Sequence, residues 1–293
     1  MAYRWAILSL ISAFTLATSD ALTKKALCMW NEYIVAWLRL IFSLPILLVI
    51  LLFIPFPGLD KYFYIAFFVS LPLEILSIVM YMKALKLSPL SLTLPFLSLT
   101  PLFLIFISYV ILGEKVSLWG GMGILLIVSG GYTLNISRIK EGLFEPLRAI
   151  TREKGSILMI GVAFIYSITS SLGKMAIEHS SPLFFGATYF TAITLIFTPI
   201  ALFNKRRETG PSMGRQLLAH ALILPGIFYS LMVASHMIAI SIAKVAYVIS
   251  VKRMSLLIGV FYGYLFFKEK NIRERLLGAT LMFIGFLMVV NAA

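Results

Sequence analysis

Two adjacent cations, Lys252 and Arg253, lie inside a long apolar stretch that covers residues 243–267. Charged side chains at such a depth in an apolar segment are costly unless they are paired, hydrated or part of a functional site. A fixed cation in a low-dielectric region would attract a carboxylate or a phosphate group strongly. The alternative is that one of them forms an ion pair with Glu74, which would only hold two helices together.

Glu74 is an acid in the middle of another apolar stretch, residues 62–82, two positions after Pro72. On a helix, Ser77 and Tyr81 would share its face at i+3 and i+7. A carboxyl group at this depth could contact a substrate or carry a proton, so Glu74 is our proton-coupling candidate. Its pairing with a nearby cation remains the structural alternative.

Four more residues complete the expected substrate-binding set: Asp20, Tyr81, Ser170 and His236. Asp20 and Ser170 belong to polar stripes in two apolar segments, where they could wall a wet cavity or only hydrogen-bond a neighbouring helix. A lone histidine such as His236 is more often structural than a proton shuttle.

Three further cations lie nearer to segment ends. We expect Arg39, Lys24 and Lys174 to extend toward the lipid headgroups and to act mainly as anchors.

The sequence contains no pattern typical of an enzyme or a metal site. Its three histidines and one cysteine are scattered, and no phosphate loop, nucleophile elbow or nucleotide fingerprint is present. We therefore expect no catalytic residues, no bound metal, no cofactor and no enzymatic activity.

The elements that must position these residues follow from composition. Of 293 residues, 60% are apolar and 13% are charged, with a mean hydropathy of +0.98. So few charges cannot cover that much apolar surface, which excludes a water-soluble domain and a disordered chain. The net charge is +13, and the basic residues lie mostly between apolar runs. This placement favours contact with anionic lipid headgroups and not with nucleic acid.

The chain is expected to be an all-α integral membrane protein, because spanning helices need about 20 apolar residues. Ten segments meet this pattern, at residues 5–23, 34–53, 62–82, 92–112, 119–134, 156–174, 183–203, 217–238, 243–267 and 276–290.

An internal repeat divides these segments into two sets of five. Residues 81–85 match residues 236–240, Lys24 matches Lys174, and two glycine pairs match across the fifth and tenth segments: Gly123 and Gly130, Gly278 and Gly285. The units would cover residues 1–135 and 156–293, joined by a basic interfacial linker at 136–155. Because five is odd, the second unit must enter the membrane from the opposite side, giving two inverted five-helix repeats.

Two short acidic motifs recur at the start of the fifth and tenth segments. Glu114 and Glu269 would begin helices there, where a carboxylate meets the positive end of the helix dipole. The matched glycines would let those two helices pack closely.

The short motifs at residues 98–102, 112–115 and 267–270 resemble the drug/metabolite transporter superfamily, in its ten-helix EamA-type branch. The resemblance implies transport of amino acids, other metabolites or drugs through a central cavity with alternating access. It also implies cytoplasmic termini, whereas the basic residues lie mostly in loops after odd-numbered segments and place both termini outside.

Together these features predict a secondary transporter, an exporter or exchanger, of a small metabolite such as an amino acid or organic anion. Its partners would be that substrate, with a carboxylate or phosphate, and the lipid bilayer of a cell (inner or plasma) membrane. We expect a monomer or a weak homodimer. A channel or a non-transporting receptor remains the alternative, ahead of a membrane-embedded enzyme, and the repeat favours the transporter.

Overall fold

The computed structural model describes residues 3–28, 30–88, 93–133, 154–205, 215–267 and 272–292, and these residues are helical almost throughout. Residues 136–153 of the proposed interfacial linker and Glu269 lie outside this range, while residues 154–155 begin α8. The helices are α1 (Arg4–Leu27), α2 (Glu32–Leu52), α3 (Lys61–Leu87), the 3-10 helix η1 (Leu94–Ser98), α5 (Leu99–Leu112), α6 (Leu118–Thr133), α8 (Lys154–Glu178), α9 (Pro182–Lys205), α10 (Arg215–Ile242), α11 (Val245–Lys252), α12 (Ser255–Phe267) and α13 (Ile272–Ala292).

The outer surface of the described helices is apolar. Within the described residues, seven helices are long and apolar enough to cross a membrane, and two shorter apolar helices accompany them. Large side chains such as Phe106, Leu195 and Leu118 are exposed on the outside. A helix pairs its own main-chain N–H and C=O groups, for which lipid offers no hydrogen-bond partners. The prediction of an all-helical membrane protein is therefore confirmed.

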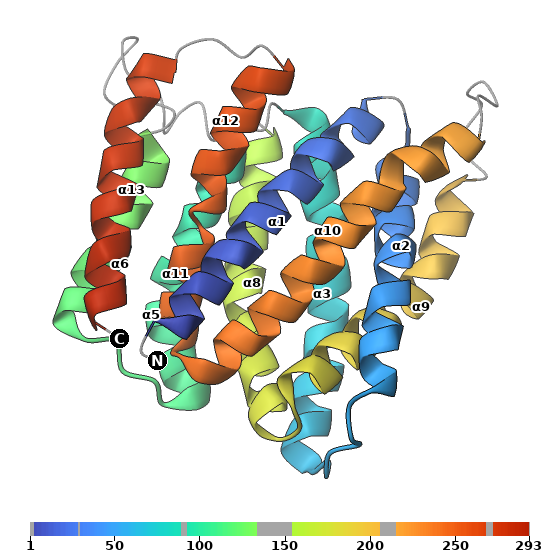
Figure 1. Ribbon diagram of the computed structural model, residues 1–293, viewed down its shortest axis with the longest axis horizontal. Coiled ribbons are helices and arrows are strands. Elements are labelled where there is room, and N and C mark those ends of the chain that lie inside the picture. Colours follow the sequence, from blue (N-terminus) through green and yellow to red (C-terminus); the bar gives the residue numbers. More distant parts are fainter. Residues whose placement is uncertain are drawn as a thin grey trace.

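The helices form two layers flanked by two pairs (Figure 1). α1, α10 and α12 lie in the front layer, and α3, α5 and α8 lie behind them. Within the layers α1 packs along α10 and α3 along α8, while α2 with α9 and α6 with α13 cover the two flanks. Both termini lie at the same end of the bundle.

Two of the expected spans are irregular: the fourth begins as a 3-10 helix that runs on directly into an α-helix, and the ninth is interrupted near its middle. The fourth consists of η1 and α5, which meet at Ser98, and the ninth consists of α11 and α12, which meet around Arg253. Pro95 and Pro101 remove backbone donors from the first of these regions. The interruption in the ninth span has no proline, and its chain tightens instead, as the amide of Met254 donates to the carbonyl of Val251.

The predicted glycine seam joins α6 to α13. A Cβ atom added to Gly123 would lie 2.8 Å from the carbonyl oxygen of Gly285, and one added to Gly130 would lie 2.6 Å from that of Gly278. Either distance is too short for a real contact, so the two backbones can approach only because side chains are absent.

We predict that Gly123→Ala lowers the thermal stability of the purified protein, because the added methyl group forces α6 away from α13. Overpacking of this kind costs about 1–3 kcal/mol. The control is Gly121→Ala on the same helix, whose added Cβ would meet only Val116, at 4.0 Å. Equal melting temperatures for the two variants would contradict the seam.

Candidate functional site

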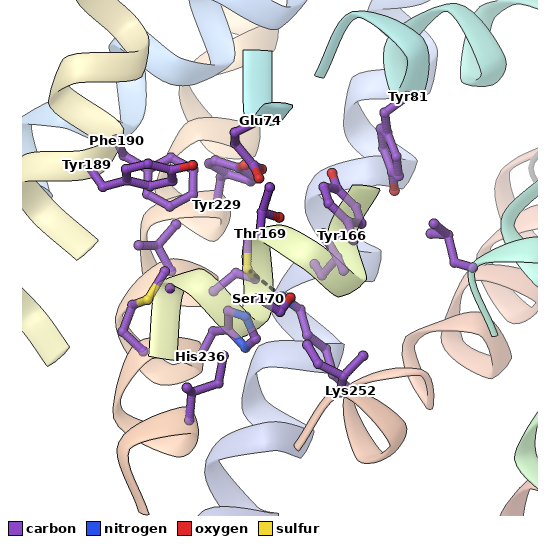
Figure 2. A pocket seen from close by; sticks show the side chains of 18 of the residues that line it. Glu74, Tyr81, Tyr166, Thr169, Ser170, Tyr189, Phe190, Tyr229, His236 and Lys252 are labelled. Atoms are coloured by element: carbon purple, nitrogen blue, oxygen red, sulfur yellow. Dashed lines mark hydrogen bonds between the residues drawn. The ribbon is translucent and has the colours of Figure 1, made fainter. Parts of the chain in front are cut away.

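A cavity of about 90 Å³ lies between the two helix layers (Figure 2). This volume is enough for several water molecules or a small ligand group. Helices from both layers and α2 and α9 contribute to its wall. Six of the seven predicted substrate-binding residues line it: Glu74, Tyr81, Ser170, His236, Lys252 and Arg253.

The two adjacent cations sit at the break between α11 and α12. Lys252 is 8% exposed and donates to the sulfur of Met232 at 3.3 Å. Arg253 is 3% exposed and donates to Thr100 Oγ1 at 2.8 Å, whereas its Nε has no partner. Within the described residues, no carboxylate lies within 4 Å of either cation. The ion pair with Glu74 is therefore absent from this structure.

Glu74 lies on α3, and Lys252 and His236 lie toward the other end of the cavity (Figure 2). Its carboxyl group is within hydrogen-bonding reach of Thr169 on α8. Aromatic rings surround this end: Phe190 packs edge-on against Tyr229 at 5.6 Å between ring centroids. The acid therefore faces polar groups and ring faces, with no cation within ion-pair distance among the described residues.

Asp20 lies just behind the cavity wall and is held by two residues that line it. Arg39 donates to Asp20 Oδ1 at 2.9 Å, and the hydroxyl of Tyr81 donates to Oδ2 at 2.5 Å. The guanidinium of Arg39 also stacks over the ring of Tyr229, at 4.4 Å from its centroid. The pair is almost fully buried, with 4% of each side chain exposed.

This arrangement corrects the expectation for Arg39, which does not extend to the headgroups. Asp20 lies seven residues before the end of α1 at Leu27, and Arg39 lies seven residues after the start of α2 at Glu32. Both therefore sit about 10 Å from the shared loop at helical rise. The sequence contained this signal, since two opposite charges at equal depth on consecutive helices can pair.

Lys24 and Lys174 are also not headgroup anchors. Lys24 donates to the carbonyls of Leu85 and Ser88 at the end of α3. Lys174 donates to the carbonyl of Ala243 at 2.8 Å and pairs with Glu114 at 2.5 Å. Each lysine thus caps the carboxyl end of another helix, as cations favourably do.

Glu114 does meet the amino end of a helix, but not the one that follows it. Its Oε2 accepts from the amide of Val245 at 2.9 Å, which is the first residue of α11. The expectation that it begins α6 is wrong, because α6 starts at Leu118.

The cavity carries an excess of formal positive charge. Arg39, Lys252 and Arg253 line it, and Arg39 is balanced by Asp20. The other two cations share the wall with one carboxyl group, Glu74. Such a site favours a small ligand with at least one acidic group, and the tyrosine rings supply apolar faces with polar tips. Sequence reasoning missed the aromatic wall, since tyrosines are also frequent at membrane interfaces.

We predict that Asp20→Asn destabilises the protein by about 3–5 kcal/mol, because it leaves the guanidinium of Arg39 buried without its counter-charge. Thermal unfolding of the purified protein would measure this. Tyr81→Phe is the milder control, since it keeps the ion pair and removes one hydrogen bond to a charged group, worth about 1.5–3 kcal/mol. The double variant Asp20→Asn/Arg39→Gln should recover part of the loss, and a stable Asp20→Asn single variant would contradict the pairing.

Comparison with known proteins bears directly on this site. A model of the EamA-like transporter family matches the chain twice, at residues 3–136 and 153–291. A protein of known crystal structure has the same fold, with a TM-score of 0.69 and 15% sequence identity over 97% of this chain and 95% of that chain. The comparison with curated proteins gave no match. The chain therefore belongs to the EamA-like transporter family within the drug/metabolite transporters, and so to the multi-pass membrane transporters of small substrates.

Proposed function

We propose that this protein is a secondary transporter, an exporter or exchanger, of a small metabolite whose carboxylate or phosphate group binds Lys252 and Arg253. One observation carries the proposal. Two buried cations sit together at a helix break inside the cavity, and no carboxylate lies within 4 Å of them in the described residues. Buried charges without a partner are expensive, so a scaffold role alone would not retain them.

The position of the cations on the chain adds to this argument. They lie at the end of α11, where the partial negative charge of the helix terminus stabilises them. Broken helices at mid-membrane are a common way to build a transporter site. The matching position in the first unit is Ser98, where the 3-10 helix changes to an α-helix and no charge is present, so the charge belongs to one side of the site.

The proposed architecture is ten spans arranged as two inverted five-helix repeats. Paired contacts support it: α1 packs along α10 as α3 packs along α8, and the α6–α13 seam pairs matched glycines. Lys24 bonds Ser88 as Lys174 bonds Ala243. The location would be a cell (inner or plasma) membrane, with alternating access around the cavity. Saturable counterflow would separate this transporter from a channel or a receptor.

We predict that Lys252→Met weakens binding of an anionic ligand by about 10-fold to 100-fold, since a hydrogen bond to a charged group is worth about 1.5–3 kcal/mol. Binding and flux in liposomes would be compared for amino acids, organic anions and cationic drugs. Arg253→Lys keeps the charge and removes the two-pronged donor, so it should reduce affinity without changing melting behaviour.

The control for these variants is Lys25→Met, which removes an exposed lysine from α1 outside the cavity. The contradicting result would come from the double variant Lys252→Met/Glu74→Gln. If it restored both folding and transport, the two residues would form a structural pair and the anion site would be wrong.

The second prediction of this proposal concerns coupling. If Glu74 carries protons, Glu74→Gln should abolish gradient-driven uptake and leave substrate-for-substrate exchange intact, because exchange needs no net proton movement. Both reactions would be followed in the same liposomes with an imposed pH gradient. Equal loss of both would remove Glu74 as the proton carrier and leave it as a substrate ligand or a structural group.

A further inference from the structure

Two lysines bridge the helix layers at opposite ends of the cavity. Lys24 on α1, in the front layer, donates to the carbonyl of Ser88 at 3.0 Å and to that of Leu85, both at the end of α3 in the back layer. Lys174 on α8, in the back layer, donates to the carbonyl of Ala243 at the end of α10 in the front layer. We call these contacts the Lys24 clamp and the Lys174 clamp.

The Lys174 clamp contains a second bridge. Glu114 pairs with Lys174 at 2.5 Å and accepts from the amide of Val245 at 2.9 Å, so it ties α8 and the α5–α6 loop to the start of α11. Lys244 adds a bond from the same chain segment to the carbonyl of Lys115, at 2.9 Å. The bond from Lys174 to Ala243 crosses between the layers, whereas the Lys174–Glu114 pair joins α8 to the loop after α5, both in the back layer.

The two clamps are also matched in the sequence repeat. Lys24 corresponds to Lys174, and Ser88 is as far from Tyr81 as Ala243 is from His236. Other described ion pairs do not bridge the layers: Asp60 with His179 joins α3 to α8 within the back layer. Other hydrogen bonds also cross between the layers, such as Tyr81 with Asp20 and Arg253 with Thr100, but they involve residues that line the cavity.

We propose that the Lys24 and Lys174 clamps are the two gates of the cavity, and that each must release for the cavity to open at its own end. The inference rests on the alternating access proposed above. A lysine bound to carbonyls at a helix end can exchange those hydrogen bonds for hydrogen bonds to water when its end of the cavity opens. Each gate is therefore stable while water is excluded and reversible once water enters. Both clamps are formed in this structure.

The two ends differ in a second layer of contacts just inside the clamps. One turn before Lys24, Asp20 accepts a bond from Tyr81, which crosses from α1 to α3. At the matched positions near Lys174, no hydrogen bond joins Ser170 to His236 in the described part of the chain, and both line the cavity. The Lys174 end should therefore open when its clamp alone is removed, whereas the Lys24 end keeps a second closure.

The experiment uses a cysteine in the cavity as a reporter of access. Leu16 lines the cavity from α1, so Leu16→Cys is introduced with Cys28→Ser, and labelling by an impermeant thiol reagent is timed in sealed vesicles of both orientations. Cys28 itself, exposed at the end of α1, marks the Lys24 side in the parent protein. Its labelling in intact cells also measures membrane orientation.

We expect Lys174→Met and Glu114→Gln to speed labelling from the Lys174 side by about tenfold, which corresponds to about 1.4 kcal/mol in the closed-to-open equilibrium. Labelling from the Lys24 side should not rise. Lys24→Met alone should act weakly on its own side, and Lys24→Met/Tyr81→Phe should act strongly there. Lys25→Met, which removes an exposed charge beside Lys24, is the matched control and should have no sided effect.

A purely structural capping role gives a different pattern. If Lys174→Met and Lys24→Met only lowered the melting temperature, or raised labelling equally from both sides, the gate assignment would be overturned. The readout needs no substrate, so a failure of the anion site in binding assays and a failure of the gates in labelling assays are separate results.

Discussion

The cost of placing charge inside a membrane governs the rest of this structure. A cation at mid-membrane must find a counter-charge, polar partners or water, because lipid offers none of them. Arg39 meets this demand with Asp20 and the ring of Tyr229. Tyr81 donates in turn to Asp20, so the four residues hold α1, α2, α3 and α10 together. Lys252 and Arg253 meet it only in part, with a sulfur and a hydroxyl group. Both cations line the cavity, where a ligand would have access to them.

Helix breaks supply the second condition for such a site. An unbroken helix at the ninth span would direct Lys252 and Arg253 about 100° apart. Ending α11 at Lys252 and restarting the helix at Ser255 leaves both side chains on the cavity wall, and Arg253 reaches Thr100 in the opposite layer. The change of helix type at Ser98 in the first unit lies close by, so backbone irregularity is confined to places where protein or cavity covers it, as membranes require.

The two matched units complete each other across the cavity. Glu114 of the first unit binds the amino end of α11 in the second, and Lys174 of the second unit binds Glu114 in return. The chain of contacts therefore links gate, broken helix and cation pair: α11 starts at the Lys174 clamp and ends at Lys252. Movement at that end of the bundle would be transmitted along two turns of helix to the proposed anion site.

The sequence by itself determined the class of fold, the family and six of the residues that line the cavity. Apolar segment length and low charge leave helices in a membrane as the solution, and the repeated glycines of the fifth and tenth segments indicated positions of close helix contact. The structure shows that these two helices contact each other, with Gly123 against Gly285. Charges inside apolar segments indicated Glu74, Lys252 and Arg253 because their cost is local and readable residue by residue.

Tertiary structure alone decided which charges are satisfied. Lys24 and Lys174 lie as near to a segment end as a headgroup anchor would, and only packing shows that carbonyl groups and Glu114 receive them. Depth is a property of one helix and can be counted along the sequence. Which group pairs with a buried charge depends on which helices are neighbours and how they are rotated, and no single helix contains that information.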